Sequence, residues 1–205
     1  MQINDGYIEY VPNKGKEFYQ WWKDIPPMPY DEYIQKFWPA SHKIGWGSHQ
    51  PVILHMLNCV PEGRVLEFGM GPFSTPLMSI ICEKQQRKLL SIDNNRKYFG
   101  PMMHYPGIKF VFMDRKIIEG SYKFFGKKFA IAFVDAHPPE LRQIFINRMK
   151  ANVDYFIVHD TENPEPYQYD FTGFKHVLQF EHANPKTSVL SDLDVIDKRI
   201  LEIFK

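Results

Sequence analysis

The first candidate for chemistry is the segment RVLEFGMGPFST, in which an apolar run with Glu67 near its end is followed by Gly69 and Gly71. Glycine has no Cβ, so the backbone of such a turn can approach a ligand closely, and a helix that starts after it offers free N–H groups. Asp93 ends the next apolar run. A carboxylate there can accept hydrogen bonds from both hydroxyls of a ribose. The two features together predict a ligand that contains adenosine.

The third residue after Gly71 separates two classes of ligand. Dinucleotide-binding folds use G-x-G-x-x-G, whose third glycine allows close packing of the helix, and Ser74 stands at that position here. Glu67 would repel a pyrophosphate but suits a ligand with a positive ammonium or sulfonium group. The pattern therefore favours S-adenosylmethionine over NAD and makes a nicotinamide-dependent oxidoreductase the weaker alternative.

A second set of candidates follows the later apolar runs: Asp135, His137, His159 and Asp160. A histidine with a pKa near its reference value of about 6.5 can take a proton at neutral pH, so both histidines are candidates for a general base. Each is equally compatible with a structural role. A transition-metal site formed by His137, His159 and Asp160 is a weaker hypothesis.

These residues need elements that bring them to one edge of a sheet. Between residues 63 and 160, short β-branched or aromatic runs alternate with longer amphipathic segments, which is typical of βαβ units with a parallel sheet. The predicted strands cover residues 64–68, 88–93, 108–114, 129–135 and 155–160. Four of the five end in Asp. Ligands of open α/β sheets bind at the carboxyl ends of the strands, so the acids are expected along the binding edge.

Helices and a terminal hairpin complete the predicted core. Ser74 or Thr75 followed by Pro76 predicts the start of one helix, and 138–152 predicts another. Two closely spaced runs, 174–182 and 187–191, predict an antiparallel hairpin. The fold class is therefore α/β, with seven strands in a mostly parallel sheet, an antiparallel last strand and helices on both faces. The tail after residue 191 fits a helix or a strand.

The chain is predicted to be a single domain, residues 1–205, with a core of 51–205. Residues 1–50 contain two predicted short helices, around 16–25 and 31–38, and are expected to form a helical flank or lid. A further helix over 49–57 leads into the first strand.

Composition and local patterns limit the partners and the compartment that are expected for the protein. Lys and Arg number 25 against 24 Asp and Glu, so no overall charge favours nucleic acid or an anionic membrane. The start of the chain lacks the pattern of a secretory signal, and no segment is apolar enough to span a membrane. The two cysteines lie in apolar stretches and are expected to be buried free thiols. These features predict a cytoplasmic protein.

At this point the sequence resembles the class I, Rossmann-like S-adenosylmethionine-dependent methyltransferases, over roughly residues 46–191. The motifs that carry the resemblance are LEFGMGPFST, LLSIDNN, FMDRK, FAIAFVDAHPPELR and YFIVHDTEN, which occur in the family's order. The concluding hairpin also matches the family's sheet. The residues that the resemblance implies for cofactor binding are Ser48, Glu67, Gly69, Gly71, Ser74, Asp93, Asn94, Asp114, Arg115 and Asp135. Asp114 fits a helix cap or strand end equally well.

The resemblance also bears on the acceptor and on metal. Some small-molecule O-methyltransferases of the catechol type bind magnesium at positions that Asp135 and Asp160 match. His159 is a poor magnesium ligand, so no metal is assigned and magnesium is the less favoured alternative. The amine-methylating members carry Asp/Asn-Pro-Pro-aromatic where this chain has His137 followed by Pro-Pro-Glu. The expected function is O-methylation of a small hydroxylated acceptor. The alternative is a catalytically inactive S-adenosylmethionine-binding partner or scaffold.

Overall fold

The computed structural model describes residues 47–71, 73–95, 107–119 and 126–205. The helices predicted in the first 40 residues, and with them the proposed lid, lie outside the described residues.

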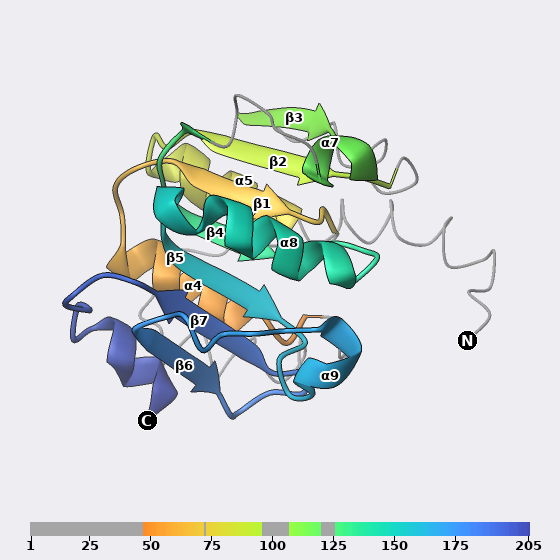
Figure 1. Ribbon diagram of the computed structural model, residues 1–205. Helices are drawn as coiled ribbons and strands as arrows, with labels where there is room; N and C mark the ends of the chain where they lie inside the picture. The colour runs from red at the N-terminus through yellow and green to blue at the C-terminus, as the bar shows by residue number, and fades with distance from the viewer. Residues whose placement is uncertain (1–46, 72, 96–106, 120–125) are drawn as a thin grey trace.

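A seven-stranded sheet forms the centre of the molecule (Figure 1). Its strands are β1 (Val65–Phe68), β2 (Leu89–Asp93), β3 (Ile108–Phe112), β4 (Phe129–Val134), β5 (Val153–His159), β6 (His176–Phe180) and β7 (Thr187–Ser191). The strand order is β3-β2-β1-β4-β5-β7-β6. Strands β1 to β5 pair in parallel, whereas β7 is antiparallel to both β5 and β6. The predicted fold class and the predicted terminal hairpin are confirmed.

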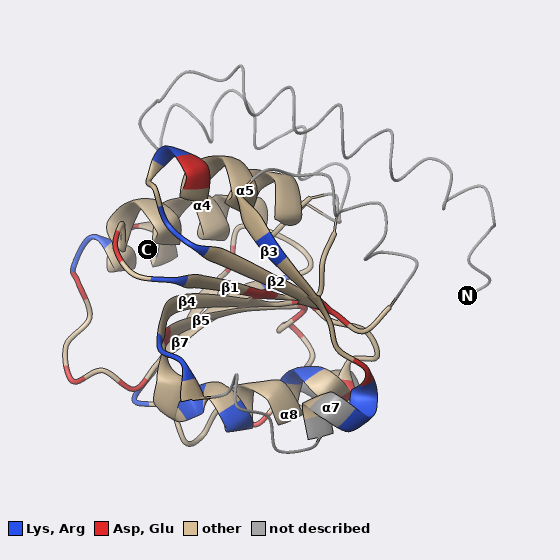
Figure 2. Ribbon diagram, turned by 90° about the horizontal axis from the view of Figure 1, so that it is seen from above, with Lys and Arg blue, Asp and Glu red and all other residues tan. Residues whose placement is uncertain are grey.

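Helices cover both faces of this sheet (Figure 2). On one face lie α4 (Gln50–Cys59) and α5 (Thr75–Lys84), and on the other lie α7 (Arg115–Glu119) and α8 (Glu140–Met149). The remaining helical turns are η2 (Lys150–Asn152), α9 (Pro164–Tyr167) and η3 (Ile200–Phe204). The undecided tail thus ends in a 3-10 helix, which packs on α4 and β6. Among the described residues, no helix has the length and apolar character needed to cross a membrane.

The core consists of two apolar clusters, one on each side of the sheet. Alternation along β1 divides its residues between them: Val65 belongs to the cluster under α4 and α5, and Leu66 and Phe68 belong to the cluster under α8. Phe68 stacks on Phe145 of α8 with ring centroids 4.2 Å apart. Both faces of the central strands are therefore buried, as is usual for parallel sheets.

The start of α5 differs in one detail from its prediction. Ser74 is the residue before the helix and Pro76 lies in its first turn, as expected, but the Ser74 side chain makes no capping hydrogen bond. Its hydroxyl donates to Glu67 instead, at 2.7 Å. The physical reason is that this hydroxyl makes a stronger hydrogen bond with a buried carboxylate than with a neutral backbone N–H group.

The loop after β1 comes into direct contact with the loop after β4. Gly69 has φ +98°, and a Cβ added there would lie 2.4 Å from backbone atoms of Asp135 and Ala136. Gly71 differs, because a Cβ there would meet only Ser74 Oγ, at 3.8 Å. Gly69 is thus required by the fold itself, and Gly71 is the glycine that leaves room beside the backbone.

We expect Gly69→Ala to destabilise the protein by at least about 2 kcal/mol, because it adds both backbone strain and a steric clash. Gly71→Ala, the matched control, should change the free energy of unfolding by no more than about 0.5 kcal/mol. Urea unfolding of both variants measures the difference. Equal losses of stability in the two variants would contradict this assignment.

Candidate functional site

Glu67 lies in the interior, on the α5 side of the sheet, with no exposed surface. Its two carboxylate oxygens accept hydrogen bonds from Ser74 Oγ at 2.7 Å, Thr75 Oγ1 at 2.9 Å and Ser91 Oγ at 2.6 Å. These three hydroxyls connect β1 to the start of α5 and to β2. The predicted contact of Glu67 with a cationic cofactor stays a prediction, and any such attraction would act across this ring of hydroxyls.

Asp93, at the end of β2, stabilises the turn of residues 69–71, which we call the glycine turn. Its Oδ2 accepts the N–H of Met70, between the two glycines, at 2.7 Å, and its Oδ1 accepts the N–H of Asn95 at 2.5 Å. Burial raises the pKa of Asp93 to about 6, although these backbone donors partly oppose the shift. The neighbouring Asn94 donates from Nδ2 to the carbonyl of His137 at 2.7 Å. The predicted ribose acid therefore holds the glycine turn at the end of β2, and its neighbour Asn94 connects this strand end with the loop after β4.

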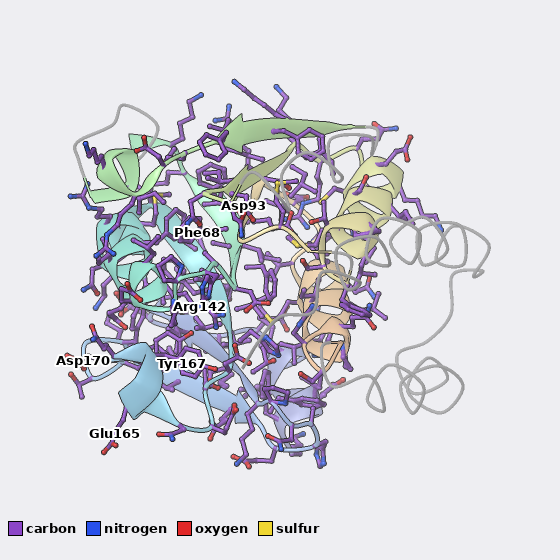
Figure 3. The ribbon with its side chains drawn as sticks, turned by 90° about the vertical axis from the view of Figure 1, so that its right-hand side faces the viewer. Phe68, Asp93, Arg142, Glu165, Tyr167 and Asp170 are labelled. Carbon is purple, nitrogen blue, oxygen red and sulfur yellow. The ribbon has the colours of Figure 1, made fainter. Side chains whose placement is uncertain are left out.

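Arg142 of α8 lies at the centre of a second group at this edge. Its guanidinium is 2.8 Å from Asp135 Oδ1, at the end of β4, and 2.9 Å from Asp160 Oδ2, after β5. It also donates to the carbonyls of Ala136 at 2.7 Å and His159 at 3.2 Å. Figure 3 looks onto the carboxyl ends of the strands and shows Arg142 and Asp93 at this edge. Sequence reasoning missed Arg142, because nothing in the helical pattern marks it as the partner of two acids.

His159 extends this group toward the start of α4. Its Nε2 is 2.8 Å from Ser48 Oγ, and its Nδ1 lies 3.3 Å from Asp135 Oδ1 and 3.4 Å from Asp160 Oδ1. The ring of His49 packs edge-on against His159, with centroids 4.6 Å apart, and contacts Phe133 at 4.8 Å. The resemblance included His49 in a segment expected near the cofactor, with Ser48 as the donor, and assigned His49 no role of its own. We call His49, Asp135, Arg142, His159 and Asp160 the strand-end cluster.

The charges of the strand-end cluster shift one another strongly. Burial would raise the pKa of Asp135, but Arg142 and His159 outweigh burial and hold that pKa below its usual range. Burial would lower the pKa of His159, but Asp135 outweighs burial and raises it. Burial and the nearby His159 lower the pKa of His49 to about 3, so its ring is neutral near pH 7. Within the cluster Asp135 keeps the largest part of its side chain exposed, 25%, and Asp160 keeps 15%.

Three predicted residues lie at the exposed surface and outside the strand-end cluster. His137 is exposed on the loop after β4. Asp114 and Arg115 are exposed at the start of α7, where Arg115 pairs with Glu140 of α8 at 3.2 Å. The hypothesis of a metal site at His137, His159 and Asp160 is not supported by this arrangement, because His137 is separate from the buried group. For magnesium, the guanidinium of Arg142 already bridges the two carboxylates that would be its ligands.

The aromatic segment after β5 covers one side of the cluster. Tyr167, Tyr169 and Phe171 stack in sequence, with centroid separations of 5.4 and 5.1 Å. Tyr169 donates its hydroxyl to the carbonyl of His159 at 2.9 Å, and Arg142 lies 5.1 Å from the centre of the Tyr167 ring. Figure 3 shows Tyr167 on the same side as Arg142. These rings limit access to Arg142 from that side.

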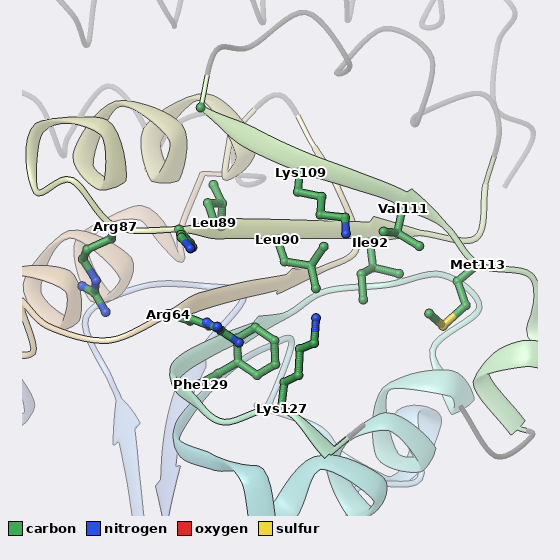
Figure 4. Close-up of a pocket in the computed structure, with 12 residues that line it drawn as sticks. Arg64, Arg87, Leu89, Leu90, Ile92, Lys109, Val111, Met113, Lys127 and Phe129 are labelled. Atoms are coloured by element: carbon green, nitrogen blue, oxygen red, sulfur yellow. The ribbon is translucent and has the colours of Figure 1, made fainter. Parts of the chain in front are cut away.

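A cavity of about 460 Å³ lies elsewhere, beside β2 and β3 (Figure 4). Its floor includes Leu90, Ile92 and Val111, and basic residues such as Lys88 and Lys127 line it from the residues that precede β2 and β4. The lining runs along the sheet and reaches Ile92 and Met113, near the carboxyl ends of β2 and β3. None of the lining residues is a predicted site residue or a member of the strand-end cluster.

No protein-family model matches the sequence, and no curated protein matches it. Among solved structures the chain is similar to CalS11, described as a TDP-rhamnose 3'-O-methyltransferase of calicheamicin biosynthesis. The identity is 12% and the TM-score 0.51, and the match covers 87% of this chain and 93% of that one.

Two further structures are less similar. A human methyltransferase 10 domain containing protein has 12% identity and a TM-score of 0.49, and the match covers 71% of this chain and 81% of that one. MtNAS in complex with MTA and tNA has 14% identity and a TM-score of 0.48, with 89% and 69% covered. The fold assignment rests on CalS11 and on the strand order. The chain has the fold of the class I, Rossmann-like S-adenosylmethionine-dependent methyltransferases.

The buried Glu67 predicts a specific dependence of stability on pH. Burial raises its pKa from 4.5 to about 7, so the folded protein binds this proton more tightly than the unfolded chain. The free energy of unfolding should therefore fall as the pH rises from about 4.5 to 7. Relative to Glu67→Gln, the wild type should lose about 2 kcal/mol over that range.

Denaturant unfolding of both proteins between pH 4.5 and 8 measures this difference. Glu62→Gln, at an exposed carboxylate, controls for the loss of one surface charge. A difference between wild type and Glu67→Gln that is constant with pH, or that changes in the opposite direction, would rule out the burial of an ionisable carboxyl at this position.

Proposed function

We propose that this protein transfers a methyl group from S-adenosylmethionine to a hydroxyl of a small acceptor. The observation that carries the proposal is the contact between the glycine turn and the strand-end cluster: the backbone of Gly69 lies against that of Asp135. A cofactor held at the turn would place its reactive group beside a charged, partly exposed carboxylate. The fold of CalS11, which is described as an O-methyltransferase, is compatible with this proposal.

The residues at the turn fit the proposed cofactor. Space beside Gly71 admits a ligand to the backbone, and the carboxylates of Glu67 and Asp93 make the turn attractive to a cation and unfavourable for a pyrophosphate. In the proposed complex Asp93 accepts the ribose hydroxyls, and Asn94 lies next to it. Asp114 and Arg115 are proposed for the adenine edge. Bound S-adenosylmethionine would supply an electrophilic methyl group on its sulfonium.

The chain itself would orient the acceptor and remove its proton. We assign the removal of the acceptor's proton to His137. This histidine is exposed, and Asn94, beside the proposed cofactor residues, donates a hydrogen bond to its backbone carbonyl. His159 has less access to an acceptor, since its ring is 5% exposed and its Nε2 is bonded to Ser48. The exposed part of Asp135 would accept a hydrogen bond from a second hydroxyl of the acceptor. This division of roles favours acceptors with more than one hydroxyl.

Calorimetric titration with S-adenosylmethionine, S-adenosylhomocysteine and NAD tests the cofactor. Both adenosyl ligands should bind and NAD should not. Asp93→Ala should weaken adenosyl binding by about tenfold or more, since two hydrogen bonds to the ribose are worth more than 1.4 kcal/mol. Gly71→Ala should weaken it by filling the space beside the turn.

Asp154→Ala is the matched control, because Asp154 lies at the amino end of β5. The proposal fails if neither adenosyl ligand binds, or if Asp93→Ala binds them as tightly as Asp154→Ala does.

Turnover of a panel of small hydroxylated acceptors tests the base. His137→Ala should lower turnover by about 100-fold or more, the usual contribution of a general base, with an affinity for S-adenosylmethionine close to that of the wild type. His182→Ala, another exposed histidine, is the control. Full activity of His137→Ala would remove this residue from the mechanism. Tight cofactor binding without turnover of any acceptor would favour the inactive, scaffold alternative.

A further inference from the structure

Both ring nitrogens of His49, in the strand-end cluster, are buried and have no hydrogen-bond partner among the described residues. Nδ1 of His159 makes no hydrogen bond of good geometry there either, although carboxylate oxygens of Asp135 and Asp160 lie 3.3 and 3.4 Å from it. His49 is 2% exposed and His159 is 5% exposed, so water does not satisfy these atoms from outside. A buried polar atom without a partner destabilises a folded protein, and most such atoms are paired. The two unpartnered nitrogens of His49, beside a His159 nitrogen that is held only by ion pairing, indicate that a ligand belongs between the two rings.

These nitrogens face a carboxylate at a separation suited to a metal ion. One ring nitrogen of His49, one of His159 and a carboxylate oxygen of Asp135 all lie within 4.8 Å of one another. Metal–ligand bonds of about 2.1 Å place ligand atoms roughly 3 to 4 Å apart, so the side chains need to move inward by about 1 Å or less. We propose that His49, Asp135 and His159 bind a divalent first-row transition-metal ion.

The surroundings of the three residues fit this role. A histidine that binds metal through one nitrogen usually hydrogen-bonds through the other, and Nε2 of His159 does so with Ser48 Oγ at 2.8 Å. The carboxylate of Asp135 is oriented by Arg142 at 2.8 Å. Two of the three ligands are therefore already oriented by outer partners.

The charge around the site favours a cation. Asp135 and Asp160 carry two negative charges, Arg142 balances one of them, and the second favours either a proton on His159 or, in its place, a metal ion. Both ring nitrogens of His49 are without a hydrogen-bond partner in the part of the chain that the structure describes, so its ring can supply a lone pair at no cost in broken hydrogen bonds. Two imidazoles and one carboxylate suit Zn²⁺, Fe²⁺, Mn²⁺ or Co²⁺ better than Mg²⁺, which prefers oxygen ligands.

The site differs from the metal sites considered from the sequence. In the proposed site His49 takes the place of the exposed His137. Asp160 is paired with Arg142 and is not one of the three ligands. Because Asp135 keeps a quarter of its side chain exposed, open coordination positions would face the same edge of the sheet as the glycine turn. An ion there could bind an oxygen of a ligand and lower its pKa. The binding of the ion does not depend on the proposed methyl transfer.

Calorimetric titration of the metal-free full chain with Zn²⁺, Co²⁺ and Mg²⁺, without S-adenosylmethionine, tests the proposal. Zn²⁺ and Co²⁺ should bind one ion per chain, with visible Co²⁺ ligand-field bands, and Mg²⁺ should bind at least about 100-fold more weakly. Ser48→Ala should weaken Zn²⁺ by about 10- to 100-fold, as expected for loss of an outer partner. His49→Ala should weaken it further and abolish the Co²⁺ bands.

His182→Ala, at an exposed histidine, is the matched control and should bind like the wild type. His49→Phe guards against loss of folding: it should also lose the ion, yet raise the melting temperature of the metal-free protein, because it removes two unpaired buried nitrogens. Absence of Zn²⁺ and Co²⁺ binding in the wild type would overturn the proposal. Binding that is unchanged in both His49 variants would overturn it as well, by placing the ion elsewhere.

Discussion

The buried guanidinium of Arg142 is the interaction on which the functional edge depends. It connects α8 to the ends of β4 and β5 by pairing with Asp135 and Asp160. Without it, two carboxylates would lie close together in a site with little water, and their repulsion would force one of them to bind a proton. Because Arg142 balances only one of the two carboxylates, the charge of the other remains to hold a proton on His159 or a metal ion in its place. Structural stability and the capacity to bind ligands thus come from the same group of charges.

Two other acids at the strand ends also stabilise the fold, by accepting hydrogen bonds. Glu67 accepts three hydroxyl hydrogen bonds, and Asp93 accepts two backbone N–H groups of the turns that a ligand would approach. Each carboxylate is thereby held in one rotamer before any ligand arrives, which lowers the entropic cost of binding. Asp135 differs from Glu67 and Asp93 because part of its side chain is exposed to solvent.

A shared fold places a limit on functional inference. The strand order and the similarity to CalS11 at 12% identity assign the architecture, and one architecture supports many activities. The features of this chain that bear on its function are the buried His49, the bond between Ser48 and His159, and the bridging Arg142. They lie beside the glycine turn because Gly69 allows the loops after β1 and β4 to come into contact.

The sequence by itself determined the sheet, the terminal hairpin, the helix starts and the acids at the strand ends, because alternation, turn residues and proline are local signals that short segments carry. It also identified Asp93 and Asp135 as residues of one edge. Only the tertiary structure decided their partners. Arg142 and His49 join Asp135 through strand order and helix placement, and Ser48 meets His159 across 111 residues of chain. Such contacts have no sequence period, since they depend on which strands become neighbours and on how far each helix is rotated about its axis.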